Sequence, residues 1–280
     1  MVCERFKIPV DLTSMSTRIP RALTIAGSDS GGGAGIQADL KTFTAFRVFG
    51  MSVLTSITAQ NTQSVLGISD LPPEFVELQI DAVISDIGVD AVKTGMLSNP
   101  GIISAVVRKI KQHGIEKLVV DPVMRAKGGN RLLRSEAEKA LTEKLLPLAL
   151  IVTPNIPEAE VLSGMTISSV EDMREAAKSI KFFGPEYVLV KGGHLESAQE
   201  AVDILYSGKE FYEFRAPRVQ TKNTHGTGCT YSAAICSSLA KGFDMVDSVK
   251  RAKDYVTEAI KKSFSLGKGH GPLNHFWEFE

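Results

Sequence analysis

The sequence has few cysteines, and this shortage excludes a disulfide scaffold. Its 280 residues include three cysteines, Cys3, Cys229 and Cys236, which form no CxxC pair. An odd and sparse set of this kind is typical of a reducing compartment. Cys229 and Cys236 lie on one expected helix, roughly 10 Å apart along its axis, which is too far for a disulfide. We therefore expect a cytoplasmic protein.

The sequence also lacks an excess of either charge and any long apolar segment. The 32 basic and 32 acidic residues cancel, which argues against nucleic acid or an anionic membrane as partner. Residues 1–20 mix charges with two prolines, so we expect a loose leader without a signal peptide or membrane span, and Met15 is an alternative start. With 43% hydrophobic and 23% charged residues, positions 21–280 are expected to form one domain that binds a small molecule.

Short apolar runs alternate with amphipathic segments along this domain. The expected strands are Ala22–Ala26, Met51–Thr58, Ala91–Lys93, Leu118–Val120, Ile151–Val152 and Tyr187–Val190. The clearest helical patterns are Gly101–Lys111, Val170–Lys181 and Met245–Phe264. Ala201–Tyr206 and Glu210–Arg215 flank Ser207-Gly208-Lys209 and predict a small hairpin at the sheet edge. The alternation predicts an α/β fold in which helices cover both faces of a mostly parallel central sheet.

Two glycine-rich segments precede expected helices. The first, Gly27–Gly35, follows the first strand, and the second, Asn223–Thr230, runs into the helical pattern of Tyr231–Lys241. Gly226 and Gly228 let backbone N–H groups converge at the positive end of a helix that we expect to begin at Cys229. Such a point binds anions, most simply phosphate, although a plain helix cap has similar composition. Two such loops suggest two ends of a ligand site held face to face.

Polar or glycine-rich residues follow each expected strand, where open parallel sheets bind their ligands. In chain order these residues are Gly27-Ser28-Asp29, Gln60-Asn61-Thr62, Thr94-Gly95-Met96, Asp121-Pro122-Val123-Met124, Thr153-Pro154-Asn155 and Lys191-Gly192-Gly193-His194.

Seven ordered segments carry a resemblance to a known family. They read AGSDSGGGAGIQADLKT, TAQNTQ, KTGML, DPVM, TPNIPEAEVL, KGGH and APRVQTKNTHGTGCT. From about Arg21 to about Phe276 the chain resembles the hydroxymethylpyrimidine kinase/hydroxymethylpyrimidine phosphate kinase family of thiamine synthesis, within the ribokinase-like superfamily. The resemblance implies a ribokinase-like three-layer α/β/α sandwich and an enzyme that uses ATP and Mg²⁺. It implies phosphorylation of 4-amino-5-hydroxymethyl-2-methylpyrimidine to the monophosphate and then to the diphosphate. It also implies a homodimer, although no residue pattern identifies an interface.

The resemblance places phosphoryl transfer at the second glycine loop. Cys229 matches the family's cysteine, where larger ribokinase-like enzymes carry an aspartate base, so we expect positioning to matter more than general-base catalysis. A helix N-terminus can lower a thiol pKa, although a nearby phosphate opposes this. The amides of Gly226, Thr227 and Gly228 would form an anion hole, with Thr227 near the nucleotide. Lys191 would contact the nucleotide phosphates. A buried capping cysteine and a solvated lysine are the structural alternatives.

Asn155 and Glu158 resemble the superfamily's NxxE element, which helps to hold magnesium beside the nucleotide, mostly through water. Their spacing puts both side chains on one side of a first helical turn, and magnesium favours few carboxylates and many waters. The same spacing fits a capping box with Asn155 as N-cap, and both interpretations can hold together. Asp121, just after its strand, is a second metal candidate or a structural turn aspartate.

Gln60 is the residue that we expect to select the pyrimidine, because a side-chain amide offers a donor and an acceptor side by side. An aminopyrimidine edge presents the complementary pair, and the family's matching position contacts the ring. Asp39 matches another pocket position of the family, with an ordinary exposed helix aspartate as the alternative. Gly27, Met96, Val123 and also Met124 are expected to provide room and apolar cover for the ring.

Other functions fit the same residues less well. Gly33–Ala38 matches the loose dinucleotide pattern G-x-G-x-x-G/A, but the acid expected about twenty residues later is missing. No G-x-x-x-x-G-K-S/T motif occurs, which excludes a P-loop enzyme. A pyridoxine or pyridoxal kinase stays open, because some relatives with a GTGC loop accept vitamin B6, and so does a non-catalytic binding protein on this fold. Arg125–Arg134 is either a mobile flap over the site or a simple exposed loop.

Overall fold

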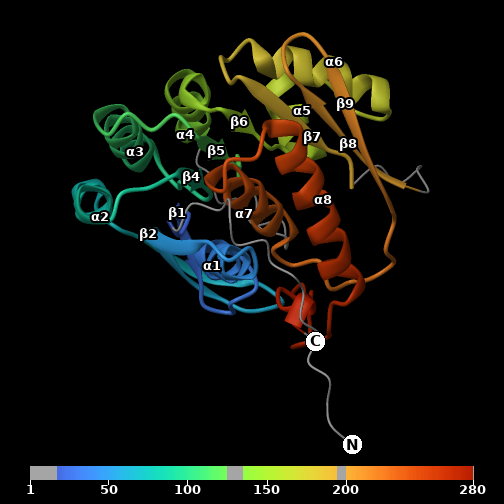
Figure 1. The fold of residues 1–280 in the computed structure, drawn as a ribbon, viewed down its shortest axis with the longest axis horizontal. Helices are drawn as coiled ribbons and strands as arrows, with labels where there is room; N and C mark the ends of the chain where they lie inside the picture. Colours follow the sequence, from blue (N-terminus) through green and yellow to red (C-terminus); the bar gives the residue numbers. More distant parts are fainter. Residues whose placement is uncertain (1–17, 125–134, 194–199, 280) are drawn as a thin grey trace, which may run out of the picture.

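A computed structural model describes residues 18–124, 135–193 and 200–279 (Figure 1). The expected flap at 125–134 and nearly all of the expected leader lie outside the described residues. None of the helices in the described ranges is long and apolar enough to cross a membrane.

The described strands form one sheet in the order β3-β2-β1-β4-β5-β6-β7-β8-β9. The run from β2 to β7 is parallel, and β3, β8 and β9 extend the two edges by antiparallel pairing. The strands are β1 Arg21–Asp29, β2 Phe49–Gln60, β3 Val65–Asp70, β4 Ala91–Thr94, β5 Leu118–Val120, β6 Ile151–Val152, β7 Tyr187–Lys191, β8 Glu200–Tyr206 and β9 Phe211–Pro217.

Helices cover both faces of this sheet (Figure 1). One layer holds α2 Pro73–Asp86, α3 Pro100–Gln112, α4 Ser135–Ala140, α5 Ile156–Ser163 and α6 Val170–Lys181. The other holds α1 Gly35–Ala45, α7 Thr227–Ala240 and α8 Met245–Lys261. A π turn at Leu141–Leu145 and two 3₁₀ turns, Leu146–Leu148 and Trp277–Phe279, complete the regular structure. The architecture is the expected three-layer α/β/α sandwich.

The strand sequences explain why both faces are covered. In β5, Leu118 and Val120 join the core beneath α2–α6, whereas Val119 between them joins the core beneath α1, α7 and α8. Successive side chains of a strand point to opposite faces, so an unbroken apolar strand requires a helix layer on each side. The central strands are thereby buried on both faces.

The predicted elements agree with the structure except at its margins. All six expected parallel strands, the edge hairpin and the three named helices are present, and α6 has the expected bounds. The helix expected to begin at Cys229 begins two residues earlier, at Thr227. The edge strand β3 and the helices α2 and α4 are present although no sequence pattern identified them individually.

The order of the strands determines where a ligand can bind. The chain adds β2 on one side of β1 and then returns to add β4 on the other side. At such a switch point the connecting loops diverge and open a crevice beyond the carboxyl ends of the strands. The ends of β1 and β4 carry Gly27–Asp29 and the residues Lys93, Gly95 and Met96, which line the cavity described next.

Candidate functional site

A cavity of about 420 Å³ opens where the strand ends meet the start of α7. Most of the residues expected to form the site line it together: Gly27, Gln60, Met96, Asp121, Val123, Met124, Asn155, Glu158, Lys191, Gly226, Thr227, Gly228 and Cys229. They come from loops up to two hundred residues apart in sequence. Asp39 is the one expected site residue that does not line this cavity.

The two glycine loops touch directly at one side of the cavity. Gly226 has φ 82°, and a Cβ added to it would lie 1.8 Å from the carbonyl oxygen of Gly33. Only glycine combines that conformation with so close an approach. A side-chain contact supports the junction, since Nε2 of His225 lies 2.8 Å from Oδ2 of Asp29. The loops are therefore held face to face, as the sequence suggested.

Asp29 organises the first loop from within. Its carboxylate accepts N–H groups from Gly31, Gly33 and Ala34 at 2.8–3.1 Å. Burial disfavours the charged carboxylate, but the hydrogen bond and charge of His225 and the N–H groups of Gly31 and Ala34 outweigh burial. The pKa of Asp29 is consequently held below its ordinary value. Asp29 is thus ionised at neutral pH.

The second loop forms the anion-binding end of the cavity. The first turn of α7 leaves the N–H groups of Gly228 and Cys229 without intrahelical acceptors, at the positive end of the helix. The N–H and hydroxyl of Thr227 both point to the carbonyl of Thr224, at 3.3 and 2.8 Å. Gly228 and Cys229 are thus better placed than Thr227 to donate amides to an incoming anion.

The thiol of Cys229 does not have the lowered pKa that its helix position allows. Burial raises the pKa of Cys229 to about 12, although Lys93 opposes the shift; Asp39 and Asp121 add to it. The side chain is partly exposed to the cavity. At neutral pH Cys229 is therefore a protonated thiol.

Lys191 and Asp121 form an ion pair beside the same loop. Lys191 Nζ lies 3.1 Å from Oδ1 of Asp121, and both residues are at most 9% exposed. A Cβ added to Gly228 would lie 3.4 Å from the lysine nitrogen, so the backbone of the loop passes close to the pair. Ser232 donates to the other carboxylate oxygen at 3.3 Å. Lys191 is thus no solvated lysine, because its cation is buried against the anion-binding turn.

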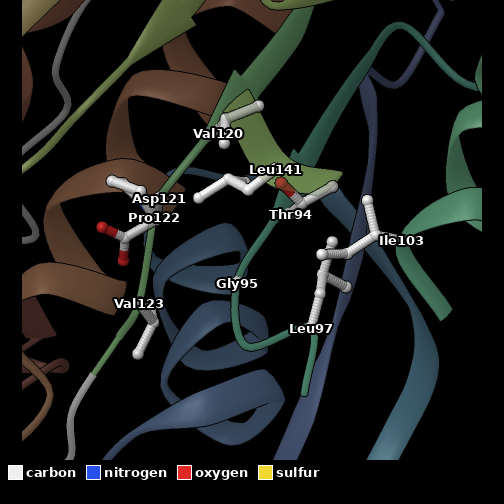
Figure 2. A pocket seen from close by; sticks show the side chains of 9 residues that line it. All are labelled: Thr94, Gly95, Leu97, Ile103, Val120, Asp121, Pro122, Val123 and Leu141. Atoms are coloured by element: carbon white, nitrogen blue, oxygen red, sulfur yellow. The ribbon is translucent and has the colours of Figure 1, made fainter. Parts of the chain in front are cut away.

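Behind Asp121, the ends of β4 and β5 enclose an apolar hollow of only about 10 Å³ (Figure 2). Leu97 and Ile103 lie on one side of the β5 chain and the Asp121 carboxylate on the other. The hollow is too small for a ring, so the ligand space is the larger cavity.

Asn155 and Glu158 form the capping box that their spacing allows. The Asn155 side chain accepts the N–H of Glu158, and the Glu158 carboxylate accepts the N–H of Asn155, each at 2.9 Å. Burial raises the pKa of Glu158 to about 7, with Lys191 opposing and Asp121 adding to the rise. Within the described ranges, no three His, Cys, Asp or Glu side chains are placed to hold a metal ion together. The carboxylates of Asp121 and Glu158 on one wall still fit a magnesium ion bound mainly through water and phosphate.

Gln60, Met96 and Gly27 lie at the end of the cavity expected to hold a ring. Gln60 is half-buried, with its amide beside Thr58 and His225. A Cβ added to Gly27 would lie 2.4 Å from Cε of Met96, so the glycine makes room for the methionine that covers this end. A side-chain amide in a cavity that Met96 also lines suits recognition of one edge of a flat ring.

The expected contact between Asp39 and the pyrimidine is not supported. Asp39 is 0% exposed, so it is also not the exposed helix residue taken as its alternative. Its Oδ2 atom lies 2.8 Å from Nζ of Lys93 and 2.6 Å from Oγ1 of Thr24. Lys93, also fully buried, lines the cavity in its place. Asp39 thus contacts a lysine that lines the cavity and does not itself line the cavity.

Sequence reasoning assigned no role to Lys93, Asp29, Thr58 or His225, which all line the cavity. One signal was available for Lys93, since a lysine within the apolar run Ala91–Thr94 requires a buried partner. His225 lies inside the second glycine loop, but its partner Asp29 is 196 residues away. Only the fold reveals such a pair.

The fold defines a protein of the ribokinase-like kinase class, in which the cavity lies beside the start of α7. The chain belongs to the phosphomethylpyrimidine kinase family, whose model matches residues 29–274.

Individual relatives agree with this family. The hydroxymethylpyrimidine/phosphomethylpyrimidine kinase of Bacillus subtilis is 50% identical over 258 residues, which cover 92% of this chain and 95% of that protein. The thiamine biosynthesis bifunctional protein ThiED of Geobacter sulfurreducens is 55% identical over 253 residues, and there the match spans 90% of this chain but 51% of the relative. Among solved structures, an ADP complex of Bacillus subtilis pyridoxal kinase has a TM-score of 0.87 at 43% identity, covering 92% of this chain and 98% of that chain.

Proposed function

We propose that the protein transfers the terminal phosphoryl group of ATP to the hydroxymethyl group of 4-amino-5-hydroxymethyl-2-methylpyrimidine, and then to the resulting monophosphate. The observation that carries this proposal is that one cavity contains both the Gln60 amide and the anion-binding turn Gly226–Cys229. The name of the 50% identical Bacillus subtilis kinase supports the same substrate, and the name of the 55% identical Geobacter sulfurreducens protein supports a role in thiamine biosynthesis.

In the proposed reaction, the substrate hydroxyl oxygen attacks the γ-phosphorus, the bond to the β-bridging oxygen breaks, and ADP leaves. The hydroxyl proton is released as the new P–O bond forms. The amides at the start of α7 and the Lys191 cation would stabilise charge on the transferring group. Asp121 and Glu158, with Asn155, would hold Mg²⁺ beside the phosphates, where the ion neutralises charge.

Cys229 would position the reacting hydroxyl rather than take its proton. A thiol whose pKa is raised to about 12 carries its proton at neutral pH and is a poor general base. A loose phosphoryl-transfer transition state depends mainly on alignment and charge neutralisation. The proposed role therefore matches what this thiol can do.

The second candidate is a pyridoxal kinase, which the 43% identical pyridoxal kinase structure favours. Pyridoxal and the pyrimidine are both flat rings with a hydroxymethyl arm, and Met96 and Val123 would cover either ring. A homodimer and a cytoplasmic location stay predictions.

Phosphoryl transfer from Mg-ATP by the purified protein tests the proposal, with the hydroxymethylpyrimidine and pyridoxine as separate substrates. Formation of pyrimidine mono- and diphosphate is the expected result. Turnover of pyridoxine alone would favour the second candidate, and pyrimidine binding with intact ATP would favour a non-catalytic binding protein. Gln60→Ala should raise the KM for the pyrimidine about tenfold and leave the KM for ATP unchanged.

A further inference from the structure

The amide of Gln60 lies between two fixed polar neighbours. Its Oε1 atom lies 3.2 Å from Oγ1 of Thr58, and its Nε2 atom lies 3.4 Å from Nε2 of His225. The oxygen and nitrogen of an amide are nearly identical in shape, so their assignment has to follow from the hydrogen-bonding partners.

His225 faces the amide as a donor. Its Nε2 atom lies 2.8 Å from the carboxylate of Asp29, which is ionised and can only accept. Nε2 must therefore carry the imidazole proton. That proton is donated mainly to Asp29, so the contact with Gln60 at 3.4 Å is weak. An amide NH₂ group there would face an N–H group and be repelled, whereas the amide oxygen of Gln60 is attracted to it.

Thr58 faces the amide as an acceptor. Its hydroxyl donates to the carbonyl oxygen of Ser28 at 2.8 Å, which is closer than its 3.2 Å contact with Gln60. A hydroxyl has a single proton, so after donating to Ser28 it has only lone pairs to offer. The favourable neighbour for those lone pairs is the NH₂ group of Gln60.

We propose that His225 and Thr58 fix the Gln60 amide with its oxygen toward His225 and its nitrogen toward Thr58, and that His225 is thereby a positioning residue for substrate specificity. The proposal rests on the proposed pyrimidine substrate. In this orientation Gln60 keeps one carbonyl lone pair and one N–H for the ligand.

The orientation determines how the pyrimidine lies in the cavity. The amide oxygen accepts the exocyclic 4-amino group on the His225 side, and the amide N–H donates to ring nitrogen N3 on the Thr58 side. The hydroxymethyl group is bonded to the carbon next to the amino-bearing carbon, on the side away from N3. It therefore extends on the His225 side, toward the loop that carries Cys229. The reverse amide would direct the hydroxymethyl group away from that loop.

The 4-oxo analogue of the substrate tests this orientation, because its N3–H and carbonyl oxygen reverse the donor and acceptor positions. Calorimetric titration without ATP gives the affinities of both pyrimidines. The wild-type protein should prefer the amino compound by about 100-fold or more. His225→Ala and Thr58→Val each free the amide to turn, so each should reduce this preference about tenfold.

A control for loss of a histidine–aspartate contact is available outside the site. His113 Nε2 lies 2.7 Å from Oδ1 of Asp81, and neither residue lines the cavity. His113→Ala should therefore keep the wild-type preference. ATP affinity should be unchanged in Thr58→Val and His113→Ala, which separates an effect on Gln60 from general damage to the site.

An unchanged amino-to-oxo preference in His225→Ala and Thr58→Val would overturn the inference. If His225→Ala does not fold, the preference of Thr58→Val alone tests the inference. This variant is expected to fold, because the side chain of valine has nearly the same shape as that of threonine. A wild-type protein that binds the amino compound no better than the oxo compound would also overturn it. A wild-type protein that binds neither pyrimidine would refute the proposed function itself.

Discussion

Gly226→Ala should separate the two glycine loops and reveal how much the activity depends on their contact. Two costs follow from the structure. The residue has φ 82°, a left-handed conformation that costs a residue with a Cβ about 1–2 kcal/mol. The new Cβ would also lie 1.8 Å from the carbonyl oxygen of Gly33, where contacts under 3.0 Å essentially never occur. The loops must therefore part by about 1.2 Å, and such overpacking costs about 1–3 kcal/mol more.

Gly242→Ala is the matched control, because Gly242 follows the other end of α7. It has φ 88°, and nothing lies within 4 Å of an added Cβ. It carries the conformational cost alone, about 1–2 kcal/mol. For a chain of this size each kcal/mol lowers Tm by about 2 °C. We expect Tm to fall by about 2–4 °C in Gly242→Ala and by about 4–10 °C in Gly226→Ala.

The kinetic difference between the two variants should be larger than the thermal one. A displacement near 1 Å of aligned groups costs about 100-fold in rate, so kcat of Gly226→Ala should fall by about that factor. Gly242→Ala should keep the wild-type kcat. Differential scanning fluorimetry and steady-state ATP turnover measure both effects. Equal losses of Tm and kcat in the two variants would refute the argument that loop contact, rather than backbone conformation, makes Gly226 necessary.

Three further predictions concern buried charges and the thiol. Lys93→Met leaves the Asp39 carboxylate without its cation and should lower the free energy of unfolding in urea by about 3–5 kcal/mol; adding Asp39→Leu should recover part of this loss, and no recovery would contradict the pairing. Because burial raises the pKa of Glu158 from an ordinary 4.5 to about 7, its contribution to stability is present below about pH 4.5 and is lost as pH rises through about 7. Between pH 5 and 8, wild-type stability should therefore fall relative to that of Glu158→Gln, by at most about 3 kcal/mol, and parallel pH profiles in urea would count against this. Cys229→Ala should lower kcat while the calorimetric affinity for the pyrimidine stays within about twofold, and an unchanged kcat would remove Cys229 from the reaction.

Sequence patterns predicted the helices and strands in which buried residues recur at the regular spacing of a helix or strand. The helix α6 was predicted with its observed bounds, because Ser169 caps it and Met173, Ala176 and Ile180 form one buried stripe. In α2 only Val76 and Ile80 are buried, while the large apolar side chains of Phe75 and Leu78 are exposed and obscure the period. The edge strand β3 was missed for a related reason: Leu66 is 76% exposed, so the strand shows no buried face.

The site could be predicted as a set of strand-end residues but not as a network. The rule that ligands bind at the carboxyl ends of parallel strands selected residues that do line one cavity. It could not show that Asp39 turns inward, because the reason is Lys93, 54 residues away in sequence. It also could not show that burial outweighs the helix N-terminus at Cys229, since the amount of burial depends on the whole fold. The sequence pattern thus locates the residues of the site. Tertiary packing determines their protonation states and their hydrogen-bonding partners.

The charges around the start of α7 support a magnesium-bound nucleotide over a free one. Asp121 neutralises much of the Lys191 cation at 3.1 Å, and Glu158 faces the same wall. Phosphate oxygens arriving there would meet carboxylate charge as well as helix amides, and carboxylate–phosphate repulsion in a buried site is strong. A divalent cation held by those carboxylates would turn this repulsion into attraction and would leave the Lys191 ammonium group available to the transferring group. We therefore propose that the nucleotide binds as its Mg²⁺ complex, because Lys191 is already paired with Asp121 and would not by itself offset the charge of a triphosphate.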